Sequence, residues 1–373
     1  MTEPKRVLFV SKPIAPPWHD GSKNLVRDVA SHLERAEPTV LTVPGAPSIG
    51  PRVKMEAVYE EGGRFTPALL ANARVLARLL RGDAQDVWHF VFAPNAASST
   101  AANVAIRARR ALGWKGTVVQ TIASAPRTFE GVSRFVFGDK VVALSEWTRG
   151  RLLGAGVTGR ELVVIPPCAR APAPVDAATK AAVRRRYDLG EGPVILYPGD
   201  YEVSSGAATV ARAVGAVVRS LPTARVVFAC REKTPRARPA ALKLQRELLD
   251  LAVHTRHVGE VDDMGALLGT ADVVVFPVDD LYGKVDVPLV LLEALALGIP
   301  LVLARGGPLE SIPTAEFVDP GDDAALARAV VAILGTEGGA SPTGPGLARA
   351  GRDLYEARFT PAVVARAYEG LYV

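Results

Sequence analysis

Two carboxylates near one apolar segment are the residues best suited to chemistry. Glu293 lies inside a run of leucine, valine and alanine residues at 289–297, and Asp286 precedes it by seven positions. A buried carboxylate is costly unless something hydrogen-bonds to it, so Glu293 predicts contact with a ligand hydroxyl or with another protein group. Asp286 is expected on the same helix face two turns away, or as a helix cap.

The segment that must position these carboxylates is predicted to be a buried helix with defined ends. Asp286 or Val287 is expected to cap its start, and Gly298 fits the left-handed position that ends many helices. The free N–H groups of Leu289 and Val290 in the first turn, together with the helix dipole, would suit an anion. The segment therefore predicts a phosphate at the helix start and a hydroxyl at Glu293.

The length and composition indicate an ordinary soluble globular protein with enough residues for two domains. The 373 residues are 49% hydrophobic and 22% charged, and the net charge is +5. The arginines are scattered, so no nucleic-acid-binding signature is present. The mild excess of positive charge fits binding to anionic small molecules or to an anionic membrane surface. Two cysteines fit a reducing cytoplasm and provide no metal site by spacing. The expected location is cytoplasmic, with the inner membrane face as an alternative.

Short apolar strands alternate with helices along the whole chain, which predicts parallel sheets. A connection near 171–174 separates two such series. Ser22 is expected to cap the first helix, and 337–346 is expected to be a flexible loop rich in glycine and proline. The expected strands lie at 6–10, 39–43, 86–92, 117–122, 140–144 and 162–165, then at 194–197, 225–229, 255–258, 273–276 and 300–303.

A helix predicted over 66–81 carries three arginines on one face, Arg74, Arg78 and Arg81. A solvated basic face on a covering helix explains this pattern, and contact with anionic lipid is the alternative.

The order of several motifs resembles the retaining GT-B glycosyltransferases of group 1, the family 4 type. Each motif is weak alone, but their order and spacing cover nearly the whole chain. The motifs are Gly21-Ser22, Asp86-Val-Trp-His89, Val142-Ala-Leu-Ser145-Glu146, Ile195-Leu-Tyr-Pro-Gly199, Ala271-Asp272 to Pro277, Leu292-Glu293 to Pro300, and Gly307-Pro-Leu-Glu310.

The resemblance implies an α/β protein of GT-B architecture, with two Rossmann-like doubly wound domains facing a cleft. Residues 1–170 would bind the acceptor, 171–358 would bind the nucleotide sugar, and 359–373 would form a helix crossing back to the first domain. The reaction implied is transfer of a hexose, with retention, to a glycan, a lipid-linked molecule or a small molecule. No metal or other cofactor is implied, because helix N-termini and basic side chains neutralise the diphosphate.

On the donor side, the resemblance assigns Glu293 to the donor ribose. The other acidic position of the family falls on Val285, and Asp286 is the nearest carboxylate. The phosphates are expected near Gly199, the first turn of the helix and the loop containing Gly306 and Gly307. Family members have Gly-Arg and a lysine on the phosphates, whereas this chain has Asp200 and Ser205. The candidate replacements are Arg231, Lys233 and Arg305, although solvated charges would explain the first two equally.

On the acceptor side, Gly21, Ser22, His89 and Ser124 are the candidates. Gly21 and Ser22 also fit an ordinary helix cap, and a lone histidine late in a strand also fits the core. Many family members have a histidine where this chain has Ala123. The missing arginine, lysine and histidine leave a second reading open, a catalytically inactive GT-B-like protein that binds a partner or glycan.

Overall fold

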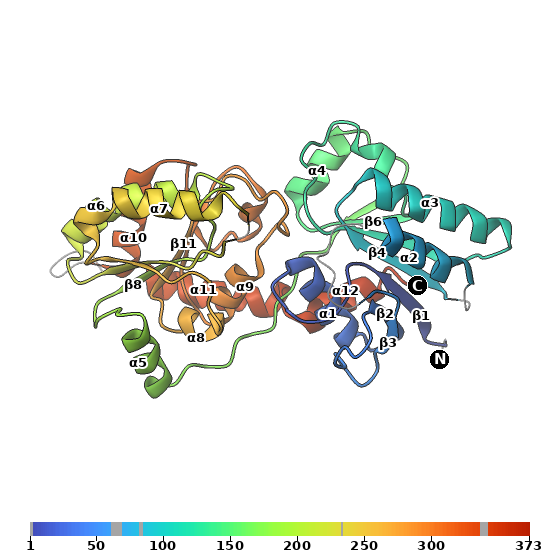
Figure 1. Cartoon of the computed structure of the whole chain (residues 1–373), viewed down its shortest axis with the longest axis horizontal. Coiled ribbons are helices and arrows are strands. Elements are labelled where there is room, and N and C mark those ends of the chain that lie inside the picture. Colours follow the sequence, from blue (N-terminus) through green and yellow to red (C-terminus); the bar gives the residue numbers. More distant parts are fainter. Residues whose placement is uncertain (1–2, 61–68, 82–84, 233, 336–341) are drawn as a thin grey trace. The chain divides into compact units, whose positions relative to one another are not determined.

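The computed structural model describes residues 3–60, 69–81, 85–232, 234–335 and 342–373. The chain forms two compact units (Figure 1). The first contains Met1–Ala169, Tyr282–Leu289 and Arg358–Val373, and the second contains Arg170–Leu281 and Val290–Ala357. The short segment Tyr282–Leu289 therefore belongs to the first unit although the chain on both sides of it belongs to the second.

The first unit is built on a seven-stranded parallel sheet in the order β3-β2-β1-β4-β5-β6-β7. Strand order reverses between β1 and β4, which makes the sheet doubly wound. The buried apolar runs of β1, β4 and β6 are typical of a sheet covered on both faces. The strands are β1 (Lys5–Val10), β2 (Ala36–Thr42), β3 (Lys54–Ala57), β4 (Val87–Phe92), β5 (Thr117–Ile122), β6 (Lys140–Ala143) and β7 (Glu161–Val164).

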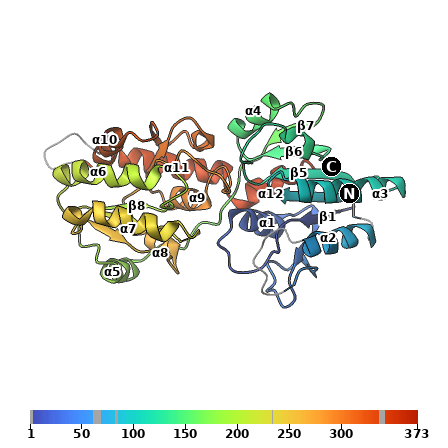
Figure 2. The same cartoon turned by 45° about the horizontal axis from the view of Figure 1, so that its top comes forward.

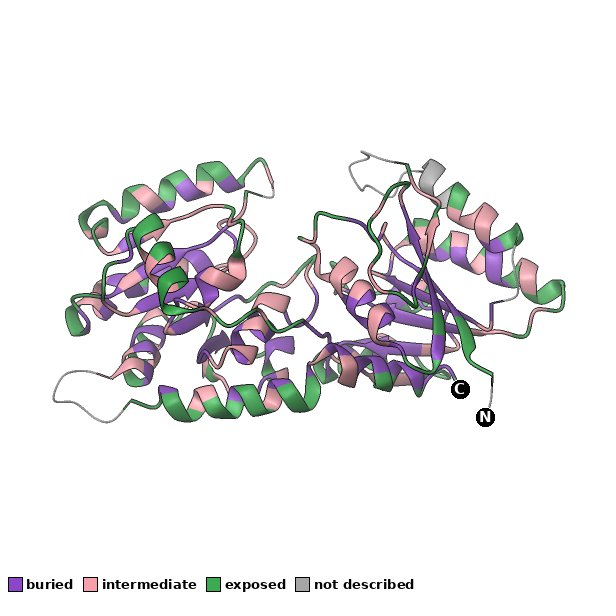
Figure 3. Cartoon of the chain, turned by 90° about the horizontal axis from the view of Figure 1, so that it is seen from below, coloured by how far each residue is buried: buried purple, intermediate pink, exposed green. Residues whose placement is uncertain are grey.

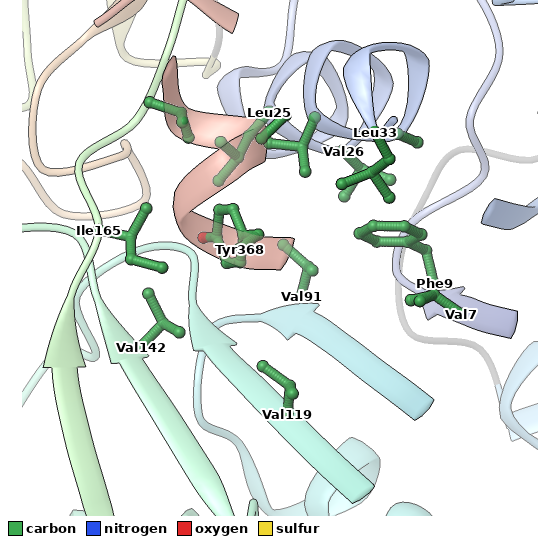
Figure 4. Close-up of a cluster of buried hydrophobic side chains, with 14 of the residues drawn as sticks. Val7, Phe9, Leu25, Val26, Leu33, Val91, Val119, Val142, Ile165 and Tyr368 are labelled. Carbon is green, nitrogen blue, oxygen red and sulfur yellow. The ribbon is translucent and has the colours of Figure 1, made fainter. Parts of the chain in front are cut away.

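Two hydrophobic clusters cover the two faces of this sheet. One joins the strands to helices α1 (Gly21–His32) and α12 (Pro361–Glu369), and Figure 4 shows Leu25, Val119 and Tyr368 within it. The other joins the strands to α2 (Leu69–Arg81) and α3 (Ala96–Ala111). The remaining helical segments of this unit are η1 (Val132–Phe135) and α4 (Glu146–Gly154).

The C-terminal helix α12 is fastened to the first unit by a buried carboxylate. Glu369 is 9% exposed, and its Oε1 accepts hydrogen bonds from the backbone N–H groups of Glu34 and Arg35, at 2.6 and 2.5 Å. These N–H groups lie just beyond the end of α1, so the contact joins the last helix of the chain to its first. Such charge-assisted bonds contribute more than neutral ones.

The second unit contains a six-stranded parallel sheet in the order β10-β9-β8-β11-β12-β13, which reverses between β8 and β11. Helix α6 packs beside α10. The strands are β8 (Val194–Tyr197), β9 (Arg225–Phe228), β10 (Thr255–His257), β11 (Val273–Phe276), β12 (Leu301–Ala304) and β13 (Glu316–Val318). The helical segments are α5 (Ala177–Arg186), α6 (Gly206–Ser220), α7 (Ala237–Glu247), η2 (Leu249–Leu251), α8 (Met264–Leu268), α9 (Leu289–Ala296), η3 (Pro308–Ser311), α10 (Asp323–Leu334) and α11 (Gly344–Arg358).

The predicted α/β class with two doubly wound parallel sheets is confirmed. Figure 2 shows helices alongside the strands in each unit, and Figure 3 shows the strands largely buried while the outer helix faces are exposed. Two local predictions were wrong. The N-cap of α1 is Asp20 rather than Ser22, and residues 344–346 of the predicted flexible loop 337–346 form the first turn of α11, while 337–341 lie outside the described residues.

Candidate functional site

Helix α9 places Glu293 on its more accessible side. Leu291, Leu292, Ala294 and Leu295 are buried, whereas Glu293 is half-buried. The carboxylate therefore avoids the full cost of burial that an apolar helix predicted for it. Gly298 follows the helix with φ 70°, the left-handed conformation expected of a helix stop.

The start of α9 differs from the prediction. The helix begins at Leu289, so neither Asp286 nor Val287 caps it. Because the chain before Leu289 is not helical, Asp286 does not share a helix face with Glu293, and the two carboxylates belong to different compact units. The N–H groups of Leu289 and Val290 still lie in the first turn, where an α-helix leaves them without intrahelical partners, and their contact with phosphate stays a prediction.

Asp286 is held inside the first unit by a helix cap. It is 2% exposed, and the Ser145 hydroxyl donates to its Oδ2 at 2.5 Å. Ser145 is the N-cap of α4, since its Oγ also accepts from the Thr148 N–H at 3.1 Å. Burial raises the pKa of Asp286, and the Ser145 hydrogen bond opposes this rise. The geometry thus gives Asp286 a structural role, fastening the segment Tyr282–Leu289 to α4.

Val285, which stands at one acidic position of the resembled family, is a core residue here. It is 4% exposed and packs in the cluster beneath α1. A Cβ added to Gly21 would lie 3.1 Å from Val285 Cγ2, tighter than ordinary contacts. The glycine at position 21 is therefore explained by the close approach of this segment to the first turn of α1.

The first turn of α1 carries its own charge pair. Asp20 accepts from Ser22 N at 2.9 Å, Ser22 Oγ at 2.6 Å and Lys23 N at 3.3 Å, and the Lys12 ammonium donates to it at 2.5 Å. Burial raises the pKa of Asp20, but the charge of Lys12 and these hydrogen bonds outweigh it and lower the pKa. The Ser22 hydroxyl therefore donates to the capping residue Asp20 and does not itself cap the helix.

His89 lies in the core of the first unit. It is 1% exposed, and its Nδ1 and Nε2 lie 2.8 Å from Tyr372 Oη and from Thr121 Oγ1. Complete burial lowers its pKa from 6.5 to about 3, so the imidazole is neutral. This geometry favours the packed role over acceptor binding. Ser124 is half-buried just beyond the end of β5 and stays an acceptor candidate.

In the second unit, the place expected for the donor phosphates holds acidic side chains. The Asp279 carboxylate accepts from the Ser205 N–H at 3.0 Å and from its hydroxyl at 2.8 Å, at the N-cap of α6. Ser204 Oγ accepts from the next N–H, that of Gly206, at 3.3 Å. The protein therefore supplies its own carboxylate to a helix start that usually suits a phosphate. Asp200 is fully buried and accepts from Val203 N at 3.0 Å.

Gly199 has an internal reason for lacking a side chain. A Cβ at this position would lie 2.1 Å from Tyr197 Cζ, and the Tyr197 hydroxyl donates to the Asp200 carbonyl at 3.0 Å. Tyr197 therefore holds the turn after β8 through this hydrogen bond, and any side chain at position 199 would displace the Tyr197 ring.

The three candidate replacement cations have different surroundings. Arg231 is half-buried after β9, and Lys233 lies outside the described residues. Arg305 is exposed and pairs with Asp319 at 3.4 Å, and it donates to the Phe317 carbonyl at 3.2 Å. In the neighbouring loop Gly306 donates its N–H to Glu310 Oε1 at 2.9 Å, while Gly307 begins η3 as its N-cap. Their phosphate contacts stay predictions.

The basic face of α2 is partly neutralised. Arg74 pairs with Glu60 and Arg78 pairs with Glu56, and the Arg78 side chain is only 13% exposed. These ion pairs neutralise two of the three arginines, which weighs against lipid contact through that face. Across the described ranges, no helix has both the length and the apolar character of a membrane span. The same residues contain no group of three side chains suited to a metal ion.

Comparisons with known proteins place this geometry in a class. A family model described as Glycosyl transferases group 1 matches residues 192–336, which include β8 to α10. A GDP-mannose-dependent alpha-(1-6)-phosphatidylinositol monomannoside mannosyltransferase of Mycobacterium tuberculosis is 25% identical over 319 residues, 81% of either chain.

Solved structures show the same fold across the whole chain. A glycosyltransferase of Rickettsia africae has a TM-score of 0.75 at 17% identity, covering 100% of this chain and 98% of that one. HepE of Anabaena, solved with UDP-glucose, has a TM-score of 0.73 at 14% identity, covering 98% and 99%. The two-sheet fold is thus that of the GT-B class. Within this fold, residues 192–336 of the second unit match the group 1 glycosyltransferase family.

Several of the residues described in the two units were not found from the sequence. Asp20 stands directly before the Gly-Ser pair, so the capping pattern alone could have indicated it. Ser145 was found only as part of a motif, and its bond to Asp286 joins positions 141 residues apart. Asp279 and Ser205 are 74 residues apart, and no local pattern joins them.

Proposed function

We propose that this glycosyltransferase moves a hexose from a nucleotide sugar to an acceptor, with retention of the anomeric configuration. The observation that carries the donor assignment is Glu293, a half-buried carboxylate on an otherwise apolar helix inside the segment matched by the family model. Glu293 would accept hydrogen bonds from the donor ribose, and the N–H groups of Leu289 and Val290 would face a phosphate. Catalysis would be mainly electrostatic and would require no metal.

The acceptor is a glycan, a lipid-linked molecule or a small molecule bound by the first unit. The mycobacterial relative acts on a phosphatidylinositol monomannoside by its name, which supports a glycolipid-like acceptor and contact with the inner face of the membrane. The first unit also holds Ser124 half-buried at the carboxyl end of β5, the sheet edge where doubly wound folds bind ligands.

A second candidate function, binding without transfer, is favoured by one observation. The Asp279 carboxylate lies at the start of α6, where the resembled family places a lysine on the donor phosphates. A negative charge there opposes a diphosphate, and each lost charge-assisted contact removes about 1.5–3 kcal/mol.

A thermal-shift panel with UDP, GDP, ADP and TDP and their common sugars tests the donor assignment. A ligand that binds only the folded protein at about one hundred times its Kd adds about 2.7 kcal/mol, so one nucleotide should raise the Tm clearly. Glu293→Ala should remove this shift and the transfer of sugar, whereas Glu247→Gln, an exposed substitution on α7, should leave both unchanged. Binding with no turnover against any acceptor would favour the second candidate, and turnover unaffected by Glu293→Ala would refute the site.

A further inference from the structure

The first unit contains a cavity of about 430 Å³ at the place where its strand order reverses. The cavity lies beyond the carboxyl ends of β1 and β4, which are neighbours in the sheet. In doubly wound sheets this reversal point is where ligands bind. The volume falls in the range of small-molecule sites, roughly 300–1,000 Å³.

The walls of the cavity are apolar and held in place by the core behind them. Phe90 and Phe92 project from the same face of β4 and pack edge-to-face on one another, with ring centres 6.1 Å apart. Phe137 packs against Phe90 from behind at 5.1 Å. Leu76 and Leu79 of α2 form the facing wall. Because these side chains also belong to one hydrophobic cluster, the cavity is a supported opening in the core.

Tyr59 contributes an aromatic ring and fixes the end of β1. Its hydroxyl donates to the Ser11 carbonyl at 2.5 Å, and burial raises the pKa of this phenol, so it stays protonated. This hydrogen bond uses only the hydroxyl of Tyr59, and the residue lines the cavity. An aromatic ring with a fixed polar end is well suited to packing against an apolar ligand group.

The lining of the cavity also includes polar side chains. Lys12, which is part of the lining, is bonded to Asp20 at 2.5 Å, and both side chains are about one third exposed. A ligand placed here would meet apolar rings and the Lys12 ammonium, whereas Asp20 is not part of the lining. A sugar hydroxyl can accept a hydrogen bond from an ammonium group.

We propose that this cavity binds the apolar aglycone of the acceptor, an aryl ring or a short alkyl chain, with the attached sugar toward Lys12. The proposal rests on the proposed function, because it assigns the acceptor to the first unit while the donor occupies the second. It adds a substrate class: an acceptor with an apolar group next to its sugar.

The test compares methyl, phenyl and octyl α-D-mannopyranoside as probes, with binding to the full chain measured by calorimetry in the absence of any donor. Burying the aglycone should make the phenyl or the octyl glycoside bind about tenfold or more tightly than the methyl glycoside. A higher affinity for the phenyl than for the octyl glycoside indicates an aryl aglycone. A higher affinity for the octyl glycoside indicates an alkyl aglycone.

A pair of variants on α3 locates the binding. Ala101 lines the cavity, so Ala101→Trp should fill it and abolish the advantage of the larger glycosides. Ala111→Trp makes the same change at an exposed position at the end of the same helix and should leave that advantage intact. The proposal is overturned if the three glycosides bind wild-type protein equally, or if Ala101→Trp leaves the advantage unchanged.

This design separates the two proposals. Donor binding is read from the nucleotide thermal shift and aglycone binding from calorimetry without donor. If no nucleotide raises the Tm while the larger glycosides still bind more tightly, only the transferase assignment is refuted. If a nucleotide raises the Tm while the three glycosides bind equally, only the aglycone pocket is refuted.

Discussion

At the reversal point of the first sheet, between β1 and β4, the structure leaves a cavity walled by aromatic and aliphatic side chains. At the reversal point of the second sheet, between β8 and β11, the Asp279 carboxylate lies on the start of α6 and Asp200 is buried in the preceding turn. Both points would be ligand sites by topology. The side chains that follow the strands determine which ligand each reversal point can bind. The first reversal point suits an apolar group. At the second, a bound anion would be repelled by the Asp279 carboxylate.

The largest effect is expected from breaking the wall of the first reversal point. Phe90 is 1% exposed and packs against Phe92 and Phe137. Phe90→Ala should lower the free energy of unfolding by about 3–5 kcal/mol, because it removes a buried ring and leaves a cavity. Urea unfolding measures this loss. Leu112→Ala, at a position 75% exposed, should change it by less than about 0.5 kcal/mol, and equal losses would contradict a supported cavity.

His89, one strand position before Phe90, predicts a pH dependence that belongs to the first unit. Its pKa is about 3 in the folded protein against 6.5 for a free histidine. Between these values the unfolded chain binds the proton and the folded one does not, so stability is full above pH 6.5 and falls as the pH decreases toward 3. The loss should reach about 2 kcal/mol at pH 5.

Urea unfolding between pH 5 and 7.5 measures this dependence. His89→Gln should unfold with a shallower pH dependence than wild type, because the substituted side chain does not titrate. His19→Gln, at an exposed histidine, should retain the wild-type slope. Parallel curves for wild type and His89→Gln would show that His89 is not the buried neutral group described above.

Most strands that lead to the reversal points could be predicted from the sequence, whereas two strands at sheet edges could not. Strands β8 and β11 are runs of buried apolar residues, and their predicted bounds match. Strands β3 (Lys54–Ala57) and β13 (Glu316–Val318) are short and half-exposed, so they show neither an apolar run nor clear alternation. Both are edge strands, paired on one side only.

The chemistry at the reversal points was less predictable because it depends on contacts between distant residues. Glu293 was found because a carboxylate in an apolar helix is conspicuous in any sequence. Asp286 was found for the wrong structural reason, since its partner is Ser145 on another helix and not the start of α9. The cavity beside Phe92 is lined by five separate segments of chain, and no spacing pattern in the sequence indicates such a gap.

The second reversal point can be tested by removing its resident charge. Asp279→Asn should raise the affinity for the nucleotide diphosphate by about tenfold or more, because a phosphate would no longer be repelled at the start of α6 and one charge-assisted contact there is worth about 1.5–3 kcal/mol. Calorimetric titration with the nucleotide selected by the thermal-shift panel measures the change. Asp280→Asn, which changes the same charge one residue further on, is the control. Unchanged affinity in Asp279→Asn would place the donor phosphates away from α6, with the start of α9 as the remaining helix terminus among the predicted contacts.

The smallest effect is expected at the charge pair beside the first reversal point. Lys12 and Asp20 are about one third exposed, and such a pair contributes up to about 1 kcal/mol in water. Lys12→Gln should therefore lower the free energy of unfolding only slightly, and less so in 1 M salt, because screening weakens the pair. Asp20→Ala should cost more, about 0.5–2 kcal/mol, because it also removes the N-cap of α1. If Lys12→Gln were the costlier change in urea unfolding, the ion pair rather than the helix cap would determine how the rim of the cavity is held.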